Sequence, residues 1–297
     1  MVNRDGGDAL FAAVHSLEAQ RDVDLSIVVV DNASQPEERE RLAREAPEAR
    51  VVAFSRNRGF AGAANEGIAR TRSPFLLLVN NDAVLAPDYV ARLAARLGLD
   101  DRLAAVQGLV LTSDGTRVDS AGLTWNGRGE AVPVLSGTPA GAAPKEAFEV
   151  SGVSATAALY RREALEDVAP QGQVFDSEFF AYYEDVDLSL RLARAGWRFA
   201  CDPAAVALHE GARTGGRTPW RRAFWTARNR WRTLFNNFDP ALLRGSIGPL
   251  LRADLAHAKR LGWKGAVLPL LVWPALPLWA LRSRGQRRRL SSWPGVP

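Results

Sequence analysis

Short apolar runs alternate with amphipathic stretches along the first 110 residues of the chain. The apolar runs predict buried strands at residues 25–30, 49–54, 74–79 and 104–111. The intervening stretches have apolar residues at helical spacing or charged helical patterns, and predict helices at residues 9–20, 36–45, 59–71 and 87–97. Strands that alternate with helices in this way predict an α/β fold, a mostly parallel mixed sheet with helices on both faces.

The pattern changes after residue 111. Residues 112–148 are rich in Gly, Pro, Ser and Thr and predict a loop-rich excursion. Order returns at residues 150–160, and a further helix is expected at residues 184–195, where Val186 and Leu190 share one face. We therefore expect one α/β domain over residues 1–216, followed by a helical tail over residues 217–297.

The tail differs sharply from the domain in charge. After residue 210 the chain has 17 Arg or Lys residues against Asp239 and Asp254, a net charge of +15, whereas the first 210 residues have a net charge of −10. Residues 265–281 are uncharged but contain three prolines, and basic residues flank both ends. Seven of the nine tryptophans follow Gly211, which is typical of a segment at a membrane interface. We expect the tail to dock on an anionic membrane surface, with a core-packing helix or a true span as alternatives.

Composition limits the other possibilities. The chain is 47% hydrophobic and 24% charged, as expected for a folded globular protein. Its single cysteine, Cys201, excludes an intramolecular disulfide framework and a cysteine-only metal cluster, which fits a reducing compartment. Residues 1–7 are polar and do not resemble a signal peptide. The proline-broken apolar run is unusual for a nucleic-acid-binding tail, so no nucleic-acid partner is expected.

Two predicted strands end in polar residues. Asp31 follows one of them and could accept from a ribose hydroxyl or a pyrimidine N–H, although such a residue is also a common helix cap. Asn80, Asn81 and Asp82 follow another. A carboxylate there could hold a divalent cation against a diphosphate, although Asn and Asp also favour plain turns.

Two further sites have side chains suited to chemistry. Glu184 and Asp185 open the helix at residues 184–195. One of them could remove the proton of an attacking hydroxyl, or both could simply complement the helix dipole. His209 follows an apolar run and could bind a metal through a neutral ring nitrogen, or be structural.

Taken in order, these motifs resemble those of family 2 inverting glycosyltransferases with a GT-A fold, especially the bacterial rhamnosyltransferase-like branch. The resemblance rests on six motifs: VVVDNAS at 28–34, NRGFAGAANEGI at 57–68, LLLVNNDAVLAPDYV at 76–90, SGVSATAALYRREAL at 151–165, FDSEFFAYYEDVDLSLRLARAGW at 175–197 and VALHEGARTGG at 206–216. Only the EDVDL…R…AGW block is specific in isolation.

The resemblance implies roles for individual residues. It makes residues 1–111 a nucleotide-binding half and residues 112–216 an acceptor and catalytic half. It implies a catalytic base at Asp185, with Glu184 beside it, and a Mn²⁺ or Mg²⁺ site at Asp82 and His209. Asn80 stands where the family's Asp-x-Asp motif has its first acid, which removes one charge from the metal site. The implied donor-binding residues are Asp31, Asn57, Gly59, Asn65, Asn80, Asn81 and Asp82.

The resemblance also implies an activity. It is the inverting transfer of a sugar from dTDP-rhamnose or a UDP-sugar to a hydroxyl of a glycan or lipid-linked acceptor, in cell-surface polysaccharide synthesis. The expected location is cytoplasmic, at the inner face of the cytoplasmic membrane. The rival interpretation is a catalytically weak or inactive glycosyltransferase-like binding protein, for which Asn80 is the best support. A nucleotidyltransferase is less favoured because no Gly-rich basic loop follows the first apolar run.

The start of the chain departs from the family. Residues 3–8 match the turn that follows the family's first strand, but only Met1 and Val2 precede it. The sequence therefore predicts that the first strand is missing and that the native protein starts upstream.

Overall fold

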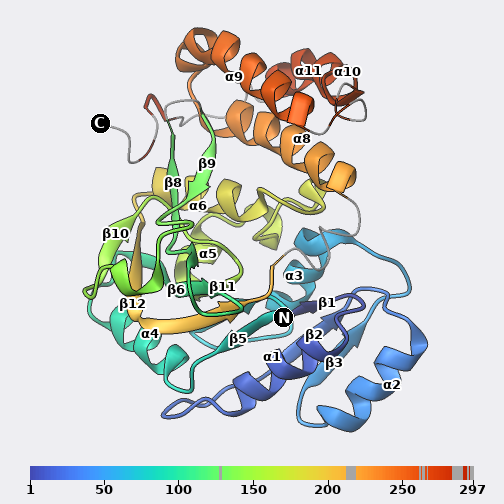
Figure 1. The fold of residues 1–297 in the computed structure, drawn as a ribbon, viewed down its shortest axis with the longest axis vertical. Helices are drawn as coiled ribbons and strands as arrows, with labels where there is room; N and C mark the ends of the chain where they lie inside the picture. The colour runs from blue at the N-terminus through green and yellow to red at the C-terminus, as the bar shows by residue number, and fades with distance from the viewer. Residues whose placement is uncertain are drawn as a thin grey trace.

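The computed structural model describes residues 1–126, 129–211, 219–260, 262, 265, 267–282, 290–292 and 294. Figure 1 shows an α/β body with a group of helices from the last third of the chain against one end of it.

The strands form mixed sheets, as predicted, but antiparallel strand pairs outnumber parallel ones among the described residues, so the expectation of a mostly parallel sheet is wrong. One sheet has the order β1-β2-β3, with all strands parallel. The larger sheet has the order β10-β12-β6-β11-β4, in which β10 and β11 are antiparallel to their neighbours. A parallel bridge between Val2 and Asn80 joins the two sheets. The strands are β1 (Val2–Asn3), β2 (Val28–Asp31), β3 (Arg50–Ala53), β4 (Phe75–Val79), β6 (Leu103–Thr112), β10 (Phe148–Val150), β11 (Ala157–Arg161) and β12 (Arg198–His209), with β5 (Ala83–Leu85) beside β12 and β7 (Val118–Ser120) beside β6.

Helices cover both faces of the sheets because each buries an apolar stripe. On one face, Leu93 and Leu97 of α4 pack with Val106 of β6, and α1 and α2 continue this layer. On the other face, Ile68 of α3 and Leu188 of α6 pack in the same cluster, which also includes α5. The helices of the body are α1 (Asp8–Glu18), α2 (Pro36–Glu45), α3 (Gly59–Ala69), α4 (Tyr89–Gly98), α5 (Arg162–Asp167) and α6 (Glu184–Arg194).

The first strand is not missing, which corrects the expectation from the sequence, but it is only two residues long. Met1 O accepts from Val30 N at 2.9 Å, so the short strand β1 holds its place between β2 and the end of β4. Beyond it, a cavity of about 440 Å³ separates residues 24–28 from β4. The cavity is largely apolar, and none of the predicted site residues lines it.

The excursion over residues 112–148 contains more regular structure than the sequence predicted. Besides β7 it forms a hairpin of β8 (Leu123–Trp125) and β9 (Ala131–Pro133), and a short helix η1 (Ala140–Ala142). Two further 3₁₀ helices, η2 (Pro170–Gly172) and η3 (Ser177–Phe179), lie in the segment that leads to α6. Trp125 of β8 packs edge-on against Phe238, so the hairpin connects the body to the C-terminal helices.

The C-terminal helices pack on one another and on the body. They are α8 (Pro219–Asn237), α9 (Pro240–Arg260), α10 (Val267–Val272), η5 (Trp273–Ala275) and α11 (Leu276–Arg282). Trp231 and Leu234 of α8 are buried in one apolar cluster with Leu190 of α6. The apolar segment 265–281 bends at its prolines, and no helix among the described residues is long and apolar enough to cross a membrane. The predicted boundary at residues 216–217 lies outside the described residues, as do the flanking Lys264, Arg284 and Arg287–Arg289.

Candidate active site

Two groups of acidic residues are anchored through one short segment at the end of the sheet. Thr156 O accepts from Asn80 N at 2.8 Å, which fixes the turn that contains Asp82. The neighbouring Ala155 N donates to Asp185 Oδ2 at 3.2 Å. Asp82 and Asp185 are 103 positions apart in numbering, yet both are held through adjacent residues of the segment before β11.

Asp185 and Glu184 form a buried acidic pair at the start of α6. Asp185 Oδ1 accepts from Val186 N at 2.8 Å, and the residue as a whole is half-buried. Glu184 is only 7% exposed, and its Oε2 has no hydrogen-bond partner among the described residues. Burial raises the pKa of Asp185, and burial together with the Asp185 charge raises the pKa of Glu184 to about 8. A carboxylate with a raised pKa is a better proton acceptor when ionised, as a general base requires.

His209 lies between two carboxylates. At the end of β12, its Nε2 is 3.2 Å from Asp82 Oδ1, and its Nδ1 is 2.8 Å from Asp119 Oδ2 on β7. Burial of the ring opposes its charge, but the hydrogen bonds to Asp119 and Asp82 outweigh burial and raise the pKa of His209 to about 9. Asp119 escaped the sequence analysis because it is 90 positions from His209 and lies in no motif.

Tyr182 connects the two acidic groups. Burial raises the pKa of Tyr182; the Arg222 charge opposes this shift, and the charges of Glu184 and Asp82 add to it. One phenol therefore lies within electrostatic reach of both the proposed base and the turn with Asp82.

The loop before α3 approaches the same region and is shaped by asparagines. Asn57 Oδ1 accepts from Gly59 N at 2.8 Å and from Asn32 Nδ2 at 3.0 Å. Gly59 has a φ of 75°, and a Cβ there would lie 2.3 Å from the carbonyl oxygen of Phe180. Only glycine fits, because the backbone at residue 180 presses against this loop.

Three other predicted donor residues have partners within the protein. Asp31 is 1% exposed, and its Oδ2 is 2.7 Å from Arg39 Nε. Asn65 exchanges two hydrogen bonds with the backbone of Phe175, at 2.7 and 2.8 Å. Asn81 donates to the side chain of Asn3 at 2.7 Å. By contrast, Asn80 has no side-chain hydrogen bond within the described part of the chain.

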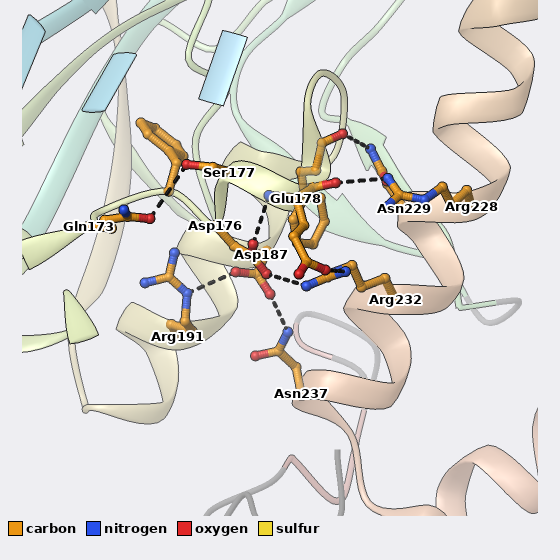
Figure 2. A network of polar contacts seen from close by, with 12 residues as sticks. Gln173, Asp176, Ser177, Glu178, Asp187, Arg191, Arg228, Asn229, Arg232 and Asn237 are labelled. Atoms are coloured by element: carbon orange, nitrogen blue, oxygen red, sulfur yellow. Dashed lines mark hydrogen bonds and ion pairs between the residues drawn. The ribbon is translucent and has the colours of Figure 1, made fainter. Parts of the chain in front are cut away.

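Helix α8 holds the segment that leads to the acidic pair. Figure 2 shows Arg228, Asn229 and Arg232 on α8, directed toward η3. Arg232 pairs with Asp176 at 2.7 Å and also with Glu178. The sequence analysis missed these contacts because it treated the helix as part of a separate basic tail.

Comparison with known proteins decides the family. The model of the family described as "Glycosyl transferase family 2" matches residues 1–169, more than half of the chain. The chain belongs to glycosyltransferase family 2. The matched region includes the turn with Asp82 and the donor-site loop at Gly59 but ends before Asp185.

Relatives with sequence similarity come from bacteria. The chain is 29% identical over 233 residues to an N-acetylglucosaminyl-diphospho-decaprenol L-rhamnosyltransferase of Mycobacterium tuberculosis, covering 70% of this chain and 73% of that protein. It is 32% identical over 113 residues to the succinoglycan biosynthesis protein ExoO of Rhizobium meliloti, covering 37% of this chain and 32% of that protein.

Solved structures show that the fold is GT-A. A mannosyltransferase of Pyrobaculum calidifontis, in complex with GDP-Man and Mn²⁺, has a TM-score of 0.58 at 19% identity, and the match covers 96% of this chain and 77% of that one. GalNAc-T7 with UDP, GalNAc and Mn²⁺ has a TM-score of 0.63 at 17% identity, and the match covers 80% of this chain but only 47% of that one.

The residues present can contribute part of a metal site. Asp82 and His209 bring one carboxylate oxygen and one ring nitrogen together, a donor pair that suits Mn²⁺. Asp119 binds the far side of the ring, as a carboxylate does behind many metal-binding histidines. No preformed group of three or more His, Cys, Asp or Glu ligands is found among the described residues, so diphosphate oxygens and water would have to complete the coordination.

Proposed function

We propose that this family 2 enzyme transfers a sugar from a nucleoside diphosphate sugar to an acceptor hydroxyl with inversion, using Asp185 as the general base. The observation that carries the proposal is the placement of Asp185 and of Asp82 with His209 around one segment at the end of the sheet. A base and a diphosphate-binding group that are held through the same segment match the two demands of the reaction.

Each demand is assigned to residues of this chain. Asp185 accepts the proton of the acceptor hydroxyl as that oxygen attacks the anomeric carbon. The nucleoside diphosphate departs from the opposite side, so a single displacement inverts the anomeric configuration and needs no covalent intermediate. Glu184 is buried beside the base, and the burial of this acidic pair favours proton uptake by Asp185.

A divalent cation, Mn²⁺ or Mg²⁺, is proposed at Asp82 and His209. When bound it neutralises the charge that develops on the departing diphosphate. His209 must release its proton before its Nε2 can bind a cation, and Asp119 holds the ring in the orientation that directs this nitrogen toward Asp82.

The donor pocket is proposed to lie between the loop at Gly59 and the turn with Asp82. Asn80 has an uncommitted side chain that can reach a ligand. Asp31 forms an ion pair with Arg39, so the Arg39 side chain would have to move before Asp31 could contact the nucleotide. The remaining predicted residues, Asn57, Asn65 and Asn81, would shape this pocket through the hydrogen bonds that they already make.

The donor and acceptor are proposed from the relatives. The mycobacterial relative is named as an L-rhamnosyltransferase acting on a lipid-linked N-acetylglucosaminyl diphosphate, and the rhizobial relative as a polysaccharide biosynthesis protein. We propose dTDP-rhamnose as the first donor to test, with UDP-sugars next. A lipid-linked glycan in cell-surface polysaccharide synthesis is the proposed acceptor.

The C-terminal helices are proposed to dock on the inner face of the cytoplasmic membrane. Arg244, Arg252, Leu255 and Lys259 are exposed on one face of α9, at spacings that bring them together. On α10, Leu270 is 73% exposed. Exposed leucines next to arginine and lysine suit an anionic lipid surface, because the apolar side chains enter the headgroup layer while the cations stay at its edge.

A thermal-shift panel tests the activity. The protein is heated with dTDP-rhamnose, UDP-glucose, UDP-GlcNAc, GDP-mannose or no sugar, each with and without Mn²⁺, and the best binder is then assayed for turnover. We expect one donor to raise the Tm only with Mn²⁺, because bound ligand stabilises the folded state by mass action. Asp82→Ala should lose this dependence and His209→Ala should weaken it less. Binding without any turnover would favour the inactive glycosyltransferase-like protein instead.

Vesicle sedimentation tests the membrane surface. The full chain should sediment with phosphatidylglycerol vesicles at low salt and not with pure phosphatidylcholine. Leu270→Asp should weaken this binding, whereas Leu99→Asp, a change at the equally exposed end of α4 in the body, should not. If both variants lose vesicle binding to the same extent, docking through α10 is contradicted.

A further inference from the structure

The turn that precedes the acidic pair has an unusual backbone. Phe180, Tyr182 and Tyr183 all have a positive φ, between 65° and 71°, although none of them is glycine. Side chains with a Cβ rarely adopt this conformation, and such a turn persists only where its surroundings hold it. Glu184 and Asp185 follow directly, so the shape of this turn sets where the proposed base begins.

One side chain of α8 holds this turn. The Nδ2 of Asn229 lies 2.8 Å from Phe179 O, 2.8 Å from Ala181 O and 2.7 Å from Tyr182 O. Its two amide hydrogens are therefore shared among three backbone carbonyls. Its Oδ1 accepts from Arg228 Nη1 at 2.9 Å, so the donating group of the amide faces the turn. Asn229 is fully buried, and water does not compete for these bonds.

The same turn also contacts the donor side of the site. Phe180 O accepts from Ala61 N, in the first turn of α3, at 3.2 Å. The carbonyl of Phe180 also lies against Gly59 so closely that no Cβ would fit there. On its other side the Phe180 ring stacks on Trp225 of α8, with centroids 5.1 Å apart. The turn is thus fixed between α8 and the loop proposed to line the donor pocket.

We propose that Asn229 is a positioning residue: its amide fixes the turn over residues 180–183 and so sets the distance between Asp185 and the donor loop at Gly59. This inference rests on the proposed function for its catalytic meaning, but the hold on the turn is independent of that function. Helix α8 is accordingly a working part of the active site.

The test compares three variants of the full chain. Asn229→Ala removes the amide, and Asn229→Asp keeps its shape but places a carboxylate against three carbonyl oxygens. Asn237→Ala is the matched control, because Asn237 is equally buried on α8 and donates to Asp187 of α6 without touching the turn. Tm, hydrogen exchange without substrate, and kcat and KM with the active donor of the panel are measured for each.

In both Asn229 variants, hydrogen exchange at the backbone amides of Ala61 and of residues 180–183 should be faster than in the wild type. The increase should be larger in Asn229→Asp. Their kcat should fall about 10- to 100-fold while KM for the donor stays within about threefold, because misplacing a base by an ångström costs rate more than binding. Asn237→Ala should lower the Tm to a similar extent without these changes.

Unchanged exchange at Ala61 and residues 180–183 in Asn229→Ala would overturn the inference, as would an equal loss of kcat in Asn237→Ala. If Asp185→Asn keeps normal turnover, the proposed base is wrong instead. The exchange data would still show whether Asn229 holds the turn.

Discussion

Asp119 Oδ2 lies 2.8 Å from His209 Nδ1, on the side of the ring that faces away from Asp82. This contact fixes both the rotation of the ring and the position of its Nδ1 proton. The remaining nitrogen, Nε2, is left directed at the carboxylate of Asp82, where the proposed cation would bind.

Replacing Asp119 should therefore weaken metal binding although Asp119 itself is not a proposed ligand. We expect Asp119→Asn to lower Mn²⁺ affinity about 10- to 100-fold, measured by calorimetric titration in the presence of UDP. Asp114→Asn is the control, because Asp114 lies in the turn between β6 and β7 and, within the described part of the chain, its side chain bonds only to Thr112 and Thr116. Equal affinities in Asp119→Asn and the wild type would show that the ring needs no such support.

The buried acid Glu184 should make the protein less stable as pH rises. Its folded-state pKa is raised to about 8, so the folded state binds more protons than the unfolded state between about pH 4.3 and pH 8. Stability is therefore lost across that window as pH increases. Glu184→Gln removes this term, so the variant should gain stability relative to the wild type between pH 5 and pH 9. Urea titrations at pH 5 and pH 9 measure the free energy of unfolding of both proteins. If the stability of Glu184→Gln relative to the wild type is the same at the two pH values, burial of this carboxyl group is contradicted.

The cavity beside β1 should accept an added strand. Extending the chain before Met1 by Val-Ile-Val-Val would place apolar side chains in the cavity between residues 24–28 and β4. Each buried side chain contributes about 1.5–3 kcal/mol, and ordering each residue costs about 1–2 kcal/mol, so a net gain of about 2–4 kcal/mol is expected for the four residues. Burial lowers the pKa of the Met1 amino group to about 6. The extension would also move the chain's terminal amino group out of this buried site.

Thermal and urea unfolding of the extended chain measure this gain. A chain extended by Gly-Ser-Gly-Ser is the control, since it adds the same length without apolar side chains. Equal stability of the two extended chains would show that the cavity does not take a strand.

The sequence predicted those parts of the fold that depend on local pattern. The strands at β2, β3, β4 and β6 and helices α1–α4 lie within about three residues of their predicted ends, because buried β-branched runs and amphipathic spacing are local signals. The short strands β7, β8 and β9 were missed, since three-residue strands have no periodicity to detect. The first strand was expected to be missing, yet backbone bonds to β2 and Asn80 keep two residues in place.

The candidate site was predicted unevenly for the same reason. Asp82, Asp185 and His209 could be proposed because each follows or opens a recognisable element. Asp119 and Asn229 could not, because their importance arises from partners about 90 and 50 positions away. Helix α8 was assigned to a basic tail by its charge, whereas its buried face packs on α6 and its polar side chains hold the turn before the base.

The most direct test of the proposed mechanism is a comparison of wild type and Asp185→Asn on the same preparations. Donor affinity is measured with dTDP-rhamnose and Mn²⁺, and transfer is measured with an N-acetylglucosaminyl diphosphate lipid, with the anomeric configuration of the product read by NMR. The account predicts an inverted product from the wild type, and a variant that binds donor within about threefold but transfers about 10²–10⁴-fold more slowly. Near-normal transfer by Asp185→Asn, or a product that retains the donor configuration, would contradict it.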